Sequence, residues 1–210
     1  MKHRIKGVYL ITDTSIQNRF SHVGLAHKTV PVGLDMIQLR DKEMSAGPLL
    51  DIAGDIARIC RETDCLFIVN DRVDIALASG ADGVHLGQND FPIRQARERL
   101  GPGKIIGGTA STLEEARSVE EAGADYIGFG HIFETGTKVK NYPPRGLDGL
   151  RRVAEAVSLP ITAIGGIHEE NMQEVIRAGA SAVAVSSVIC KAEDPGEVVR
   201  RMRMKLDRFS

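Results

Sequence analysis

The chain has 210 residues, of which 42% are hydrophobic and 26% are charged, and its formal net charge is -1. This composition is ordinary for a globular protein, and the near-neutral balance gives no reason to expect a nucleic-acid or membrane surface. The three cysteines form no CxxC pair, which argues against a disulfide framework or a zinc site and favours a reducing, cytoplasmic setting.

A five-residue pattern, Gly-[Ala/Leu]-[Asp/Ser]-x-[Ile/Val], occurs four times, beginning at Gly33, Gly80, Gly123 and Gly179. Each copy follows a stretch that can be helical and opens a short apolar run. We therefore expect the glycine just past a helix end and the polar residue in a tight loop before a buried strand. Four such junctions predict four helix-strand units.

Other strand-like runs lie between these copies, at residues 7–12, 66–70, 104–109 and 160–165, which brings the predicted strands to eight. Helical patterns alternate with the strands, and the first of them, around residues 23–31, is the weakest because Gly24 and Pro31 interrupt it. Buried Val and Ile runs alternating with helices are typical of a parallel sheet covered by helices. The pattern predicts one α/β domain over residues 1–210, a (β/α)8 TIM barrel, with an open doubly wound sheet as the alternative.

In such a barrel, functional groups are expected just after the strands. Gln38, Arg40 and Lys42 alternate after the second strand, so they point to one side of an extended chain and form an anion site. Asp71 and Asp90 follow the next two strands. Because carboxylates would repel a polyanion unless a divalent cation bridged them, we expect a Mg2+-pyrophosphate site. The plainer alternatives are a helix N-cap for Asp90 and a solvated surface position for Lys42.

A second anion site is predicted after strands seven and eight, where Gly166, Ser186 and Ser187 stand. In this fold these loops commonly hold a phosphate through backbone N–H groups and the N-terminus of a short helix. We expect a monophosphate there.

Several motifs resemble the thiamine phosphate synthase family, in the family's order and over most of the chain: YLITD, QLRDK, FIVNDRVDIALASGADGVHLGQND, GADYIGFG, TGTK, AIGGI and VSS. The resemblance implies a Mg2+-dependent barrel enzyme that joins hydroxymethylpyrimidine diphosphate to a thiazole phosphate, or its carboxylate, and releases pyrophosphate. It implies pyrimidine diphosphate contacts from Gln38, Arg40, Lys42, Asn70, Thr109 and Lys138. It implies Mg2+ ligands at Asp71 and Asp90, and thiazole phosphate contacts from Thr135, Thr137, Gly166, Ser186 and Ser187. The candidate catalytic residues are Lys138, Thr109 and His131.

The segment GHIFET, residues 130–135, departs from the synthase pattern Gly-Pro-[Ile/Val]-[Tyr/Phe]-Pro-Thr. It resembles the thiazole tautomerase branch of the superfamily, whose matching histidine is the acid/base for aromatisation of the thiazole phosphate carboxylate, so His131 is a candidate proton-transfer group. That branch tends to lose the metal aspartates, which are present here. We therefore favour the synthase, with the tautomerase and a non-catalytic phosphate-ligand binding protein as alternatives. Small phosphorylated substrates are the expected partners, and a homo-oligomer stays open.

Overall fold

The computed structural model describes residues 5–136 and 141–207. Its eight parallel strands form a closed barrel in which each strand pairs with its neighbours in chain order and β8 pairs with β1. The strands are β1 (Gly7–Thr12), β2 (Met36–Leu39), β3 (Leu66–Asn70), β4 (Gly83–Leu86), β5 (Ile105–Ala110), β6 (Tyr126–Gly130), β7 (Ile161–Ile164) and β8 (Ala182–Val185). The predicted (β/α)8 barrel is confirmed, and the open sheet is wrong.

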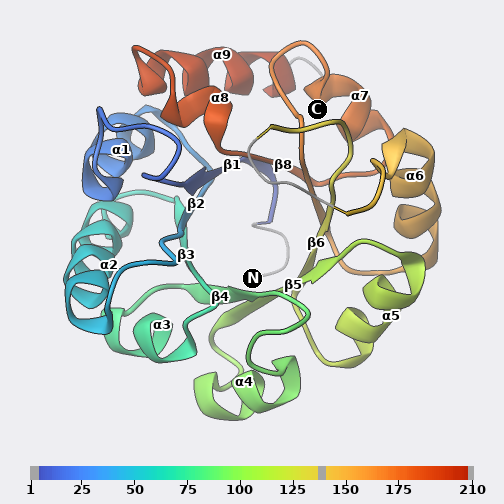
Figure 1. The fold of residues 1–210 in the computed structure, drawn as a ribbon, viewed down its shortest axis with the longest axis horizontal. Helices are drawn as coiled ribbons and strands as arrows, with labels where there is room; N and C mark the ends of the chain where they lie inside the picture. Colours follow the sequence, from blue (N-terminus) through green and yellow to red (C-terminus); the bar gives the residue numbers. More distant parts are fainter. Residues whose placement is uncertain (1–4, 137–140, 208–210) are drawn as a thin grey trace.

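Helices surround the ring of strands on its outer side (Figure 1). They are α1 (His22–Thr29), the 3-10 helix η2 (Val30–Val32), α2 (Ala46–Arg61), α3 (Val73–Ser79), α4 (Ile93–Leu100), α5 (Leu113–Glu121), α6 (Gly146–Ala156), α7 (Met172–Arg177), α8 (Ser187–Cys190) and α9 (Pro195–Asp207). The weak first helix ends at Thr29, and Pro31 lies in η2. Over the two described ranges, no helix is both long and apolar enough to cross a bilayer.

The repeated pattern forms the junctions that the sequence predicted. Its four glycines are left-handed, with φ of 95° at Gly33, 76° at Gly80, 90° at Gly123 and 106° at Gly179. In three copies the aspartate accepts a hydrogen bond of 2.8 Å from a backbone amide of the preceding strand: Asp35 from Val8, Asp82 from Phe67 and Asp125 from Ile106. The repeat therefore ties neighbouring strands together at the end of the barrel opposite their carboxyl ends.

Two apolar layers follow from the alternation of side chains along each strand. One layer packs between the strands and the helices and includes Val8, Ile37 and Phe67. The other fills the inside of the barrel and includes Tyr9 and Tyr126. The space above this inner layer, at the carboxyl ends of the strands, is where the candidate site lies.

Candidate functional site

A cavity of about 890 Å³ lies at the carboxyl ends of the strands. Nine of the predicted site residues line it: Gln38, Arg40, Asn70, Thr109, His131, Thr135, Gly166, Ser186 and Ser187. They come from strand ends or loops all around the barrel, so only the closed fold brings them together. Two further predicted residues, Thr137 and Lys138, lie outside the described residues.

The predicted metal aspartates lie beside each other, next to a cation. The Lys42 ammonium is 3.1 Å from the Asp71 carboxylate, and these side chains are 49% and 22% exposed. Asp71 has a left-handed backbone, with φ of 60°, and its amide donates to the His85 carbonyl at 2.8 Å. The Asp90 carboxylate accepts from the Gly87 amide at 2.7 Å. These backbone contacts hold both carboxylates at the ends of β3 and β4.

The surroundings of Asp71 act on its pKa in opposite directions. Burial, and then the neighbouring Asp90 carboxylate, raise the pKa of Asp71, while Lys42 acts in the opposite direction. Two adjacent carboxylates suit Mg2+, which binds one or two carboxylates together with substrate phosphates and water. Among the described residues, no group of three or more His, Cys, Asp and Glu side chains could hold a metal ion.

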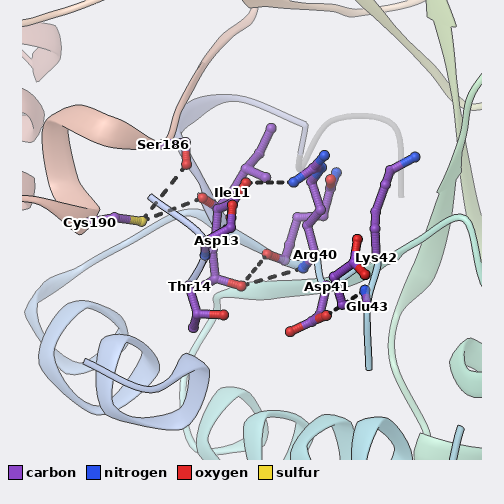
Figure 2. Close-up of polar contacts among 12 residues, drawn as sticks. Ile11, Asp13, Thr14, Arg40, Asp41, Lys42, Glu43, Ser186 and Cys190 are labelled. Atoms are coloured by element: carbon purple, nitrogen blue, oxygen red, sulfur yellow. Dashed lines mark hydrogen bonds and ion pairs between the residues drawn. The ribbon is translucent and has the colours of Figure 1, made fainter. Parts of the chain in front are cut away.

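Arg40 is fixed in the cavity by an acidic residue at the end of β1. The Asp13 carboxylate, which is 10% exposed, lies 2.5 Å from the Arg40 guanidinium. Figure 2 shows Arg40 and Lys42 extending to one side of the chain after β2, while Asp41 extends to the other side. Asp41 accepts from the Glu43 amide at 2.9 Å and so shapes the loop that carries both cations. The predicted alternation of side chains after the second strand is therefore observed.

The second predicted anion site has the expected residues and one additional cation. Gly166, Ser186, Ser187 and the exposed Lys191 line the same cavity. Gly166 has φ of 65°, and a Cβ there would lie 2.4 Å from the Glu134 carbonyl oxygen. The loop after β7 therefore packs closely against the loop after β6, which accounts for the glycine. Contact between Gly166 and an anion stays a prediction.

His131 lies in the cavity wall directly after β6, where it is only 5% exposed. Its Nδ1 is buried and has no hydrogen-bond partner among the described residues. The centres of the His131 and Tyr142 rings are 5.2 Å apart. The Arg145 guanidinium carbon lies 4.2 Å from the centre of the same Tyr142 ring. These ring contacts hold the imidazole in place, and its Nδ1 takes part in no hydrogen bond with the described residues.

The sequence analysis assigned no role to three polar residues inside the barrel: Tyr9, His85 and Tyr126. All three line the cavity, and His85 lies 2.9 Å from both the Tyr126 and the Thr109 hydroxyl oxygens. Burial lowers the pKa of His85 to about 4, so its imidazole is neutral at pH 7. The available signal was alternation, because a residue two positions before an inward-facing strand tip also faces inward.

Comparisons with known proteins agree with this geometry. The family model described as thiamine monophosphate synthase matches residues 8–189. A thiamine-phosphate synthase of Chlorobium phaeobacteroides is 51% identical over 180 residues, which cover 86% of this chain and 87% of that protein. One of Methanocella arvoryzae is 43% identical over 202 residues, covering 96% and 95%. The solved thiamine phosphate pyrophosphorylase of Pyrococcus furiosus superposes with a TM-score of 0.88 at 38% identity, covering 99% of this chain and 98% of that one.

Proposed function

The chain belongs to the thiamine monophosphate synthase family, and from this premise we propose that it joins hydroxymethylpyrimidine diphosphate to a thiazole phosphate, giving thiamine phosphate and pyrophosphate. One structural observation gives this proposal its main support. The Asp71 and Asp90 carboxylates lie together beside Lys42 at the ends of β3 and β4, and β3 pairs with β2, the strand that Arg40 follows. Such a combination of acidic and basic groups suits a diphosphate that arrives with a divalent cation.

The proposed coupling exchanges one bond for another. The bond between the pyrimidinylmethyl carbon and the diphosphate oxygen breaks, and its electron pair leaves with the diphosphate. The lone pair of the thiazole nitrogen then forms the new carbon-nitrogen bond. Because no proton has to move in these steps, the protein needs to neutralise the leaving group and position both substrates, and it needs no strong base.

The residues around the first anion site fit the leaving group. Arg40, fixed by Asp13 at 2.5 Å, presents its guanidinium to the cavity, where it would bind diphosphate oxygens. Asn70 would donate from its amide. Asp71 and Asp90 would hold Mg2+, which when bound supplies positive charge beside the leaving diphosphate.

The remaining predicted residues would orient the rest of the two substrates. Gln38 and Thr109 line the cavity and would contact the pyrimidine ring. Lys42 and Lys138 would bind the diphosphate. Thiazole phosphate contacts are proposed for Thr135, Thr137, Gly166, Ser186 and Ser187. The free, buried cysteines are compatible with the proposed cytoplasmic location.

A second candidate function rests on His131. His131 lines the cavity, and its buried Nδ1 has no partner among the described residues, which supports a role in proton transfer during isomerisation of the thiazole carboxylate. That reaction involves no diphosphate, so it gives no use to the paired aspartates. We therefore rank it below the coupling reaction.

The deciding experiment gives the purified protein both substrates and measures pyrophosphate and thiamine phosphate. The expected result is release of pyrophosphate that requires both substrates and Mg2+. Isomerisation of the thiazole carboxylate without pyrophosphate release would favour the second candidate. Calorimetric binding of the phosphorylated ligands without turnover would favour a non-catalytic binding protein.

A further inference from the structure

A continuous hydrogen-bond chain of polar side chains crosses the inside of the barrel and lines the cavity. Gln38 Nε2 donates to the Tyr9 hydroxyl at 2.7 Å, and the Tyr9 and Tyr126 hydroxyls are 3.0 Å apart. Tyr126 lies 2.9 Å from His85 Nδ1, and His85 Nε2 lies 2.9 Å from the Thr109 hydroxyl. These residues come from β2, β1, β6, β4 and β5 in that order. Both end residues, Gln38 and Thr109, also line the cavity.

The rings of Tyr9, Tyr126 and His85 are tightly enclosed and have little freedom to move. Tyr9 is 1% exposed and Tyr126 is fully buried. A Cβ on Gly107 would lie 2.1 Å from Tyr126 Cζ, and one on Gly128 would lie 2.7 Å from His85 Cε1. Two inward-facing glycines therefore make room for the two rings, and this close fit keeps the hydrogen bonds in register.

The direction of the hydrogen bonds follows from counting the hydrogens. Since Tyr9 accepts from Gln38, its own hydrogen goes to Tyr126, the other hydroxyl in reach. A buried hydroxyl hydrogen without an acceptor would cost about 1–3 kcal/mol.

The same count continues beyond the tyrosines. Tyr126 then donates to His85 Nδ1, so a neutral His85 carries its hydrogen on Nε2 and donates it to Thr109. The hydrogen of Thr109 remains for the cavity.

We infer that Tyr9, Tyr126 and His85 are positioning residues. They fix the direction of the hydrogen bonds so that Thr109 presents a hydrogen-bond donor to the substrate. At the other end of the hydrogen-bond chain, the side-chain amide of Gln38 uses one N–H to donate to Tyr9 and keeps its oxygen, Oε1, as an acceptor. The ligand class that this polarity selects is a nitrogen heterocycle whose ring nitrogen accepts from Thr109. This choice of ligand rests on the proposed function, because an aminopyrimidine has such a nitrogen, whereas the order of the chain does not depend on it.

The first test needs no substrate. In 15N-histidine-labelled protein at pH 7, two-dimensional NMR should show His85 as the Nε2–H tautomer, assigned by comparison with His85→Gln. Tyr126→Phe removes the donor to Nδ1 and should shift His85 toward a mixture of tautomers. An Nδ1–H tautomer in the unsubstituted protein would reverse the chain and overturn the inference. This readout stands even if the coupling reaction is absent, so failure here and failure of the proposed function are distinguishable.

The second test uses the coupling reaction. Tyr126→Phe should raise KM for the pyrimidine substrate about tenfold, equivalent to about 1.4 kcal/mol, with a smaller change in kcat. His85→Gln, which can keep a donor toward Thr109, should retain more affinity than His85→Leu. Equal KM values for His85→Gln and His85→Leu, in proteins that melt at similar temperatures, would show a purely structural role. Should Tyr126→Phe fail to fold, the tautomer of the unsubstituted protein still decides.

Discussion

The Lys42 ammonium lies 3.1 Å from the Asp71 carboxylate, and Asp71 holds this position with a left-handed backbone, φ 60°. Asp71→Asn should keep the fold, because asparagine tolerates that backbone conformation. It should lower kcat/KM by at least about 100-fold, the upper range found for residues that merely orient metal ligands. The amide can neither bind Mg2+ strongly nor pair with Lys42. Coupling rates measured over a Mg2+ titration check both effects.

The matched control is Asp74→Asn on α3. Asp74 is also ion-paired, with Arg72 at 2.6 Å, but its side chain is 62% exposed. Since exposed ion pairs contribute about 0–1 kcal/mol to stability, we expect less than about a twofold change in rate. If Asp71→Asn matched this control and required no more Mg2+ than the unsubstituted protein, the metal assignment would be wrong.

Glu169 gives a prediction for the pH dependence of stability. Its carboxylate receives hydrogen bonds from Arg201 at 2.7 and 3.0 Å, and Arg201 lowers the pKa of Glu169. A carboxyl group whose pKa is lower in the folded state contributes stability above its unfolded pKa, about 4.3, and loses it as the pH falls through the folded value. Glu169→Gln should therefore cost about 1 kcal/mol at pH 7 and almost nothing near pH 3.

Urea unfolding at both pH values measures this difference. Glu98→Gln, on an exposed part of α4, serves as the control and should change the free energy of unfolding little at either pH. A Glu169→Gln cost that is the same at pH 7 and pH 3 would mean that packing, and not charge, accounts for it.

Much of the fold could be predicted because its signals are local. The left-handed glycines at 33, 80, 123 and 179 end helices within a few residues of the strands that follow. Alternation after β2 placed Arg40 and Lys42 on one side, as Figure 2 shows. Each of these signals depends on a few neighbouring residues, so it survives in the sequence.

The contacts of the residues that the sequence did not reveal form only when the barrel closes. Tyr9 and Tyr126 are 117 positions apart, and their hydroxyls meet at 3.0 Å because both strands face the same interior. Asp13 reaches Arg40 across 27 positions. Alternation along the strands can place Tyr9 and Tyr126 inside the barrel, but no local pattern identifies the partners of these residues. The fold had to be closed before the partners could be identified.

Gly166 should resist substitution for two reasons. Its φ is 65°, and a Cβ would lie 2.4 Å from the Glu134 carbonyl oxygen. Gly166→Ala should lower the free energy of unfolding by about 1–3 kcal/mol and displace the loop that carries Thr135, which raises KM for the thiazole phosphate. Gly54→Ala, in α2 with nothing within 4 Å, should instead stabilise by about 0.5–1 kcal/mol. Thermal unfolding of both variants tests this, and equal stabilities would contradict the predicted strain.

His131 separates the two candidate activities. The coupling reaction moves no proton, so His131→Gln should reduce its rate by no more than about tenfold, whereas losing a general acid or base typically costs about 100- to 10,000-fold. Glutamine keeps a polar side chain against Tyr142, whose ring lies 5.2 Å from the imidazole.

Tyr142→Phe is the control, because it keeps this packing and should leave both activities nearly unchanged. Rates of pyrophosphate release and of thiazole carboxylate isomerisation are to be measured for each variant. A coupling rate that falls beyond 100-fold in His131→Gln, with substrate affinity intact, would place His131 in the coupling chemistry itself.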